Sequence, residues 1–185
     1  RILVVVVLAV AVLGACDRLG GGAQKPSFKA GDITGAEYAR ELSLPDVDGK
    51  PRQLSDFKGK VTLVFFGYTQ CPDVCPTTLA ELATVKRELG KDGDRLQGVF
   101  VSVDPARDTP EILKAYMASF DPSFVALRGT PEQTQAAARN FKVFYAQAPG
   151  KAEGSYTVDH TAGTYVFDAQ GRVRLFVRYG SGADA

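Results

Sequence analysis

The spacing of apolar and polar residues divides the chain into an apolar start, a short polar connection and a long patterned part. Residues 2–13 are apolar without interruption. A membrane-spanning helix needs about 20 such residues, so this run has the length of a signal-peptide core. From residue 32 onward, apolar runs of strand or helix length alternate with turn signals. We therefore predict one globular domain over residues 32–185.

Three apolar runs predict the inner strands of a sheet. Residues 61–66 are almost wholly β-branched, aliphatic or aromatic, which is typical of a strand buried on both faces. Residues 96–103 form a second such run, and residues 124–127 form a third and shorter one. These runs indicate the centre of an α/β sheet.

Turn signals predict a hairpin at each end of the domain. Residues 42–50 carry an Asp-Gly pair at 48–49, which favours an N-terminal hairpin. Residues 163–168 and 173–179 are expected to pair as a closing hairpin across the intervening Ala-Gln-Gly turn. Residues 143–146 are expected to form a short edge strand.

Three helices are expected between these strands. The apolar residues of 76–89 recur three or four positions apart, as on one face of a helix. Thr109 before Pro110, and Thr130 before Pro131, are typical of a helix N-cap followed by proline at the first helical position. The order of these elements indicates one α/β domain with a mixed sheet.

Composition narrows the chemistry that the domain can perform. The chain has 185 residues, 45% of them hydrophobic, and a formal net charge of +1. No block of Lys or Arg favours binding to nucleic acid. There are three Cys, one His, one Met and no Trp. This scarcity excludes multi-histidine zinc enzymes and methionine-rich metal carriers.

The first cysteine ends the apolar start of the chain. The run closes as Leu-Gly-Ala before Cys16, which resembles the lipobox of bacterial lipoproteins. We predict a lipoprotein signal peptide over residues 1–15 and a flexible tether with a lipidated Cys16 over residues 16–31. The anchored domain would then face an oxidising compartment. The alternative is an ordinary secretory signal with a chance cysteine.

The other two cysteines lie between the predicted strand 61–66 and the helix that follows. Cys71 and Cys75 are separated by three residues, and each precedes a proline. We expect the helix to begin at Pro76 with Cys75 at its cap, so that the positive helix end favours thiolates. Thiolates serve both disulfide exchange and metal binding. The alternatives are an inert disulfide and two buried free thiols.

The single histidine lies just before the closing hairpin. In a thioredoxin-like sheet order, the loop that carries His160 approaches the cysteine pair. Two thiolates and one imidazole suit copper, and three-coordinate Cu(I) is the natural fit. Asp159 is a candidate acceptor for orienting the imidazole. The alternatives are a structural or surface histidine and a turn or strand-end role for Asp159.

Three motifs together resemble the Sco/SenC family. Residues 67–76 read GYTQCPDVCP, residues 102–110 read SVDPARDTP, and residues 158–161 read VDHT. The resemblance covers roughly residues 32–180. It implies a thioredoxin-like fold of the peroxiredoxin-like variant, which is a three-layer α/β sandwich with a mixed central sheet and an N-terminal hairpin.

The resemblance also implies a ligand set and a biological role. Cys71, Cys75 and His160 would bind a copper ion, as Cu(I), Cu(II) or both. The protein would be a membrane-tethered metallochaperone at the periplasmic or outer side of the cytoplasmic membrane. Its expected partners are a copper donor protein and the cytochrome c oxidase subunit that carries the CuA site, with no nucleic acid.

Two other functions remain open at this stage. Cys71 and Cys75 could form the redox-active pair of a thiol–disulfide oxidoreductase that reduces the CuA-site cysteines. Against this, thioredoxins have a two-residue spacer and a proline where this chain has Thr161. A peroxiredoxin-like peroxidase ranks third, because Thr69 stands two residues before Cys71 rather than three.

Three further polar or soft side chains lie in or near these motifs. Asp104 and Asp108 are interpreted as loop and capping residues rather than ligands. Met117 is expected in the middle of a helix, where packing is the expected role rather than metal ligation.

Overall fold

A computed structural model of the protein describes residues 28–183. The predicted signal peptide, residues 1–15, and the predicted lipid site at Cys16 lie outside the described residues. Within the described part, every helix is too short or too polar to cross a lipid bilayer.

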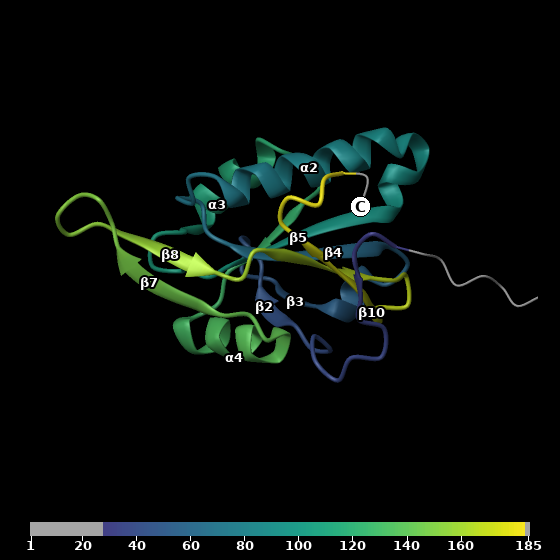
Figure 1. The fold of residues 1–185 in the computed structure, drawn as a ribbon, viewed down its shortest axis with the longest axis horizontal. Coiled ribbons are helices and arrows are strands. Elements are labelled where there is room, and N and C mark those ends of the chain that lie inside the picture. The colour runs from purple at the N-terminus through teal and green to yellow at the C-terminus, as the bar shows by residue number, and fades with distance from the viewer. Residues whose placement is uncertain (1–27, 184–185) are drawn as a thin grey trace, which may run out of the picture.

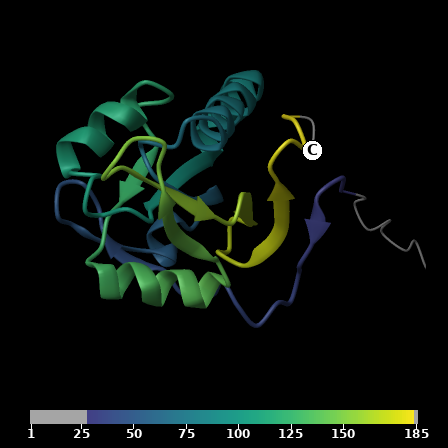
Figure 2. The ribbon, with the colours of Figure 1, turned by 60° about the vertical axis from the view of Figure 1, so that its left-hand side comes forward.

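The centre of the domain is a six-stranded sheet in the order β1-β10-β9-β4-β5-β6 (Figure 1). Strands β4, β5 and β6 are parallel, whereas β9 runs antiparallel to β4 and β10 antiparallel to β9. The predicted mixed sheet is therefore confirmed. Figure 2 shows the short β1 beside β10 at one edge. The bounds are β1 Gly31–Asp32, β4 Val61–Gly67, β5 Leu96–Ser102, β6 Val125–Leu127, β9 Gly163–Phe167 and β10 Val173–Arg178.

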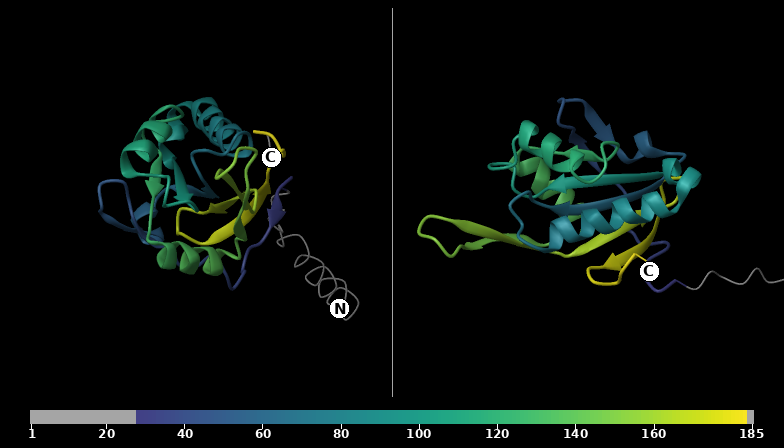
Figure 3. Two further views of the ribbon diagram at one scale, coloured as in Figure 1. Left: turned by 90° about the vertical axis from the view of Figure 1, so that its left-hand side faces the viewer. Right: turned by 90° about the horizontal axis from the view of Figure 1, so that it is seen from above.

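Helices cover both faces of this sheet. Helices α2 (Val74–Glu88) and α3 (Pro110–Ala118) lie on one face, and α4 (Pro131–Phe141) lies on the other (Figures 1 and 3). Short 3₁₀ helices, η2 (Leu54–Phe57) and η3 (Gly90–Arg95), complete the layers. The largest fully buried side chains include Phe65, Phe66, Phe100, Phe141 and Phe167. The predicted three-layer sandwich is confirmed.

The turn and N-cap residues in the sequence predicted the hairpins and most of the helix starts correctly. The N-terminal hairpin pairs β2 (Ser43–Pro45) with β3 (Pro51–Gln53), and Gly49 takes the positive φ of 77° that its turn requires. The hydroxyls of Thr109 and Thr130 accept hydrogen bonds from backbone amides of α3 and α4, as predicted. The closing hairpin is the predicted one, formed by β9 and β10.

One helix start differs from the prediction. Helix α2 begins at Val74, with Asp73 as its N-cap, rather than at Pro76. Cys75 therefore lies in the first helical turn instead of at the cap. The first turn tolerates Pro76 because its missing N–H would have no intrahelical acceptor there.

The strand predicted over residues 143–146 forms only from residue 145 onward and does not lie at the edge of the main sheet. The chain instead forms β7 (Tyr145–Pro149), which pairs antiparallel with β8 (Tyr156–His160) as a separate two-stranded sheet. Residues 156–160, expected as a loop, are thus a strand. This hairpin projects from one end of the domain in Figures 1 and 3.

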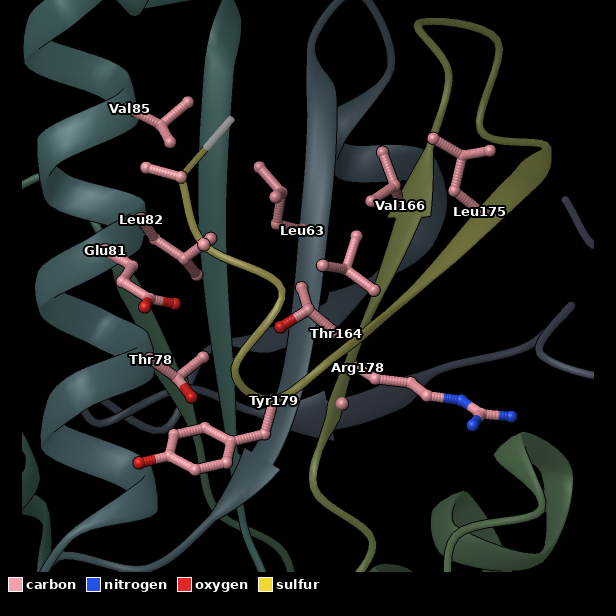
Figure 4. A pocket seen from close by; sticks show the side chains of 14 residues that line it. Leu63, Thr78, Glu81, Leu82, Val85, Thr164, Val166, Leu175, Arg178 and Tyr179 are labelled. Atoms are coloured by element: carbon pink, nitrogen blue, oxygen red, sulfur yellow. The ribbon is translucent and has the colours of Figure 1, made fainter. Parts of the chain in front are cut away.

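An apolar groove runs along α2 on the sheet face that this helix covers. Figure 4 shows Leu63, Leu82, Val85 and Val166 among the side chains that line it. The chain after Tyr179 passes over the same groove. Cys71, Cys75 and His160 do not line it, so the groove is separate from the cluster described next.

Candidate metal centre

The end of β4 and the start of α2 position the cysteine pair. Cys75 is fully buried, whereas Cys71, in the preceding loop, is partly exposed. Gly67, the last residue of β4, lies directly against Cys75. A Cβ at Gly67 would come within 2.7 Å of the Cys75 sulfur. The glycine therefore makes room for the thiol at this point.

A buried carboxylate fastens the loop that leads to Cys71. Asp108 is fully buried and accepts hydrogen bonds from the Thr69 amide at 3.1 Å and the Thr69 hydroxyl at 2.6 Å. Its other oxygen accepts a bond from the Ser102 hydroxyl at 2.6 Å. Burial raises the pKa of Asp108, although these donors oppose the rise. The carboxyl thus ties the cysteine loop to the end of β5.

The strand β8 delivers the histidine to the cysteines. The His160 ring meets the rings of Phe65 and Tyr68 edge-on, each at 5.9 Å between centroids. Its Nδ1 lies 3.2 Å from the carbonyl of Thr161. Since a carbonyl only accepts, Nδ1 carries the proton, and the lone pair of Nε2 faces the sulfurs. Nε2 is 3.4 Å from the Cys75 sulfur.

These three side chains form a compact donor cluster. The two sulfurs and a ring nitrogen of His160 all lie within 4.8 Å of one another. Metal–ligand bonds of about 2.0–2.3 Å, as in zinc sites, hold ligand atoms less than about 4.6 Å apart. The three donor atoms therefore need to move only slightly closer together to bind one metal ion. Two soft thiolate sulfurs and one imidazole, a donor that suits copper and zinc, favour such metals over hard cations.

The two thiols have very different acidities. The pKa of Cys71 falls to about 4, because the Cys75 thiol donates a hydrogen bond to its sulfur and backbone amides add to this, although burial opposes the fall. Cys75 shifts the other way: its hydrogen bond to Cys71 and its burial raise its pKa. The amide of Cys75 also donates to the Cys71 sulfur at 3.4 Å. Cys71 is therefore a thiolate at neutral pH, ready for metal binding or disulfide exchange.

Comparison with known proteins decides the family. A family model described as SCO1/SenC matches residues 31–185. The chain belongs to the SCO1/SenC family. A SCO2-like protein of Rickettsia felis is 38% identical over 133 residues, which cover 71% of this chain and 65% of that protein. The chain spans 44–65% of the length of the curated SCO relatives compared.

Solved structures of the SCO1/SenC family support the same assignment. ScoI of Bradyrhizobium japonicum, solved with copper bound, is 42% identical with a TM-score of 0.70, covering 78% of this chain and 91% of its own. BsSco, studied for a disulfide switch and described as a member of the Sco family of cytochrome c oxidase assembly proteins, is 25% identical with a TM-score of 0.58. It covers 78% of this chain and 84% of its own. The predicted thioredoxin-like fold is confirmed.

The remaining predicted residues of this SCO1/SenC chain lie as follows. Asp159 is exposed on β8, opposite Ala146, because successive strand residues face opposite sides. The contact expected of Asp159 is made by the Thr161 carbonyl instead. Met117 is buried in the core, where it packs as expected. Asp104 is buried, pairs with Arg107 in its own loop and accepts a hydrogen bond from the Tyr156 hydroxyl on β8.

Sequence reasoning missed three residues around the SCO1/SenC cluster. Gly67 had a visible signal, since a lone glycine closes an otherwise bulky strand. Tyr68 had none, because its contact with His160 spans distant parts of the chain. Arg107 was part of the second motif, yet nothing in the sequence indicated that its guanidinium reaches Gln70 beside Cys71.

Proposed function

We propose that the protein is a copper metallochaperone that carries one copper ion on Cys71, Cys75 and His160. The observation that carries the proposal is the convergence of these three donor atoms within 4.8 Å. The low pKa of Cys71 supplies one thiolate without a large cost of deprotonation. Two soft thiolates and one imidazole match the coordination that Cu(I) accepts.

Burial of the cluster supports carriage rather than catalysis by the metal. Cys75 is fully buried and the aromatic rings of Phe65 and Tyr68 flank His160, so the donor atoms are shielded on the protein side. Cys71 is partly exposed, so its sulfur is open to contact by a partner protein. The copper bound to the related ScoI supports copper as the cargo.

Anaerobic titration of the reduced domain with Cu(I) tests the proposal. We expect saturation at one ion per chain and a large loss of affinity in His160→Ala. The matched control is Asp159→Ala, which changes the neighbouring residue on the exposed side of β8 and should bind copper as the wild type does. Equal affinity in His160→Ala and the wild type would contradict the ligand set.

A second function is favoured by the unequal acidities of the cysteines. The Cys71 thiolate could attack a disulfide of the oxidase CuA subunit, after which Cys75 would resolve the mixed disulfide. The pair would lose two electrons and two protons and become a disulfide, while the partner's disulfide would become two thiols. The disulfide switch described for BsSco supports this chemistry.

Trapping of a mixed disulfide distinguishes the reductase function from the chaperone function. In Cys75→Ser, attack by Cys71 on an oxidised CuA-domain peptide should stop at a stable mixed disulfide, whereas the wild type should release reduced peptide. Cys71→Ser should do neither, because the remaining Cys75 thiol is buried, and burial both limits access to it and disfavours its thiolate. No reduction of the peptide by metal-free wild type would refute the reductase function.

The proposed partners and location follow from the function and the sequence. The copper acceptor would be the CuA-bearing subunit of cytochrome c oxidase, and a separate protein would donate the copper. A lipid on Cys16 would anchor the domain at the outer side of the cytoplasmic membrane. Labelled palmitate should enter the wild type and not Cys16→Ala. Equal labelling of both would overturn the anchor.

A further inference from the structure

The hairpin that carries His160 is outside the main sheet. Strands β7 and β8 pair only with each other among the described strands, so no ladder of backbone hydrogen bonds fixes their position on the six-stranded sheet. Val158 is the one residue of β8 that is buried. His160 is joined through two residues to β9, which holds its end of β8, whereas the other end of β8, at Tyr156, depends on side-chain contacts for its place beside the cysteine loop.

Arg107 makes several of these contacts. From the loop after β5, its Nη1 donates to the Tyr156 carbonyl at 2.8 Å and to the Gln70 side-chain oxygen at 3.1 Å. Its guanidinium lies 3.6 Å from the centre of the Tyr156 ring and 5.6 Å from that of the Tyr68 ring. Nε pairs with the Asp104 carboxylate. One side chain thus joins β8, the cysteine loop and the end of β5.

The surroundings of Arg107 make these contacts strong. Its side chain is 20% exposed and that of Asp104 is 2% exposed, so water screens the ion pair weakly. The Tyr156 hydroxyl donates to the second oxygen of Asp104 at 2.9 Å, which closes a ring of Arg107, Asp104 and Tyr156. Nη2 is buried without a hydrogen-bond partner in the described chain, so the two tyrosine faces help to balance its charge.

We propose that Arg107 is a positioning residue that locks the His160 hairpin onto the cysteine loop. The proposal rests on the proposed copper function, because it assigns to Arg107 the placement of the third ligand. Arg107 bonds to Gln70, the residue directly before Cys71, and to Tyr156, the first residue of the strand that ends at His160. It therefore fixes the distance between the sulfur and nitrogen donors without touching the metal.

A second arginine provides a matched control. Arg128 donates two hydrogen bonds to the carbonyl of Pro105, at 3.2 and 2.8 Å, and so holds the same loop from another side. It has no hydrogen bond to β8 or to the cysteine loop among the described residues. Arg107→Gln and Arg128→Gln each remove one guanidinium that contacts the loop after β5. Only the first substitution should release the hairpin.

Hydrogen exchange of the reduced, metal-free protein tests the lock directly. In Arg107→Gln, the amides of β8 should exchange at least about tenfold faster than in the wild type, whereas those of β4 and β5 should not change. Arg128→Gln should leave β8 unchanged. Equal β8 exchange in the wild type and Arg107→Gln would overturn the proposal, whatever the protein does with copper.

Copper binding then tests whether the lock positions the ligand. The Cu(II) electron paramagnetic resonance spectrum of Arg107→Gln should shift from that of the wild type toward that of His160→Ala, and Cu(I) should pass faster to a competing chelator. Arg107→Lys keeps the positive charge beside Asp104, but lysine lacks the planar guanidinium that bonds to two partners and stacks on a ring. The spectrum and the rate of copper transfer of this variant should therefore lie between those of the wild type and Arg107→Gln. A wild-type spectrum in Arg107→Gln, with His160→Ala clearly altered, would refute positioning.

The controls distinguish failure of this inference from failure of the proposed function. If His160→Ala itself binds copper as the wild type does, the ligand set is wrong, and β8 exchange still decides whether Arg107 holds the hairpin. Folding is checked by far-ultraviolet circular dichroism. If Arg107→Gln does not fold, Arg107→Lys takes its place, and wild-type β8 exchange and copper spectra in that variant would overturn the proposal.

Discussion

The cysteine region and the histidine region of the cluster are held in different ways. The cysteines follow β4, which is hydrogen-bonded to β5 on one side and β9 on the other, and whose Phe65 and Phe66 are fully buried. His160 ends a hairpin that pairs with itself. The main sheet and its core thus position the cysteine pair, with Asp108 fastening the loop, while aromatic and polar side chains hold the histidine.

This difference divides the roles of the donors. The sulfurs are held before a metal arrives, so little conformational freedom is lost when they bind one. The imidazole lies at the end of a hairpin that Arg107 and its partners help to hold in place. Because that fastening is local, affinity and release can be tuned at the histidine without disturbing the core.

The largest effect is expected at the fixed end of this comparison. A Cβ at Gly67 would come within 2.9 Å of ring atoms of both Phe65 and Phe100, in addition to the Cys75 sulfur. Gly67→Ala should therefore lower the free energy of unfolding by about 1–3 kcal/mol, the usual cost of overpacking a core. Denaturant unfolding measures this loss, and copper titration should show weakened binding.

The control for this variant is a second glycine with a similar clash. In Gly98→Ala, a Cβ would come within 2.7 Å of the Phe124 ring, away from the cysteines. It should destabilise the fold by a similar amount and leave copper affinity unchanged once folded. Weakened copper binding in both variants would mean that the cysteine geometry depends on global stability and not on Gly67.

A smaller effect is expected in the reactivity of Cys71. With a pKa of about 4, Cys71 is fully a thiolate from about pH 5 upward, so its alkylation by iodoacetamide should not rise further between pH 6 and 8. In Cys75→Ala the main donor to this sulfur is lost, its pKa rises, and labelling at pH 6 should slow at least about tenfold.

Mass spectrometry of the labelled protein checks this prediction. Cys71→Ala is the control, and its remaining Cys75 should be labelled slowly because it is buried, which limits access and disfavours its thiolate. A wild-type labelling rate that climbs tenfold per pH unit from pH 6 to 8 would show an ordinary thiol at Cys71. The cysteine region would then lack its prepared thiolate.

The smallest effect concerns the pH dependence of stability. The raised pKa of Asp108 means that the folded protein holds this proton more tightly than the unfolded chain. Asp108 thus contributes stability below the ordinary Asp pKa, and this is lost as pH rises through the raised value. Asp108→Asn should remove that slope in unfolding experiments. An unchanged slope would contradict the raised pKa.

Asp46 provides the comparison of opposite sign. Burial raises its pKa, but the Arg52 hydrogen bond and backbone amides outweigh this and leave it lowered. Its contribution is present above the ordinary Asp pKa and is lost as pH falls through the lowered one. Asp46→Asn should therefore reduce the loss of stability in acid, and an acid slope equal to that of the wild type would contradict this.

Local patterns were sufficient to predict most of the fold. The apolar run of β4, the Thr-Pro starts of α3 and α4 and the Gly-containing hairpin turns all lie within a few residues of the elements that they specify. The hairpin β7–β8 escaped prediction because only Val158 of β8 is buried, so no apolar alternation marks the strand. Its pairing is decided by contacts distant in sequence.

The candidate site likewise has a part that local sequence could predict and a part that it could not. Residue chemistry indicated Cys71, Cys75 and His160 because the chain has few other soft donors. Their supports were invisible, since Asp108 lies 39 residues from Thr69 and Arg107 lies 49 residues from Tyr156 along the chain. Such contacts depend on how β5 and the hairpin are placed in space, which short-range patterns do not encode.

X-ray absorption spectroscopy of the Cu(I)-loaded protein tests the central claim most directly, because it counts sulfur and nitrogen ligands separately. The wild type should hold one copper ion with two sulfurs and one nitrogen. His160→Ala should keep both sulfurs and lose the nitrogen, since β4 and α2 fix the cysteines independently of the hairpin. An unchanged ligand shell in His160→Ala, or loss of a sulfur together with the nitrogen, would contradict the account.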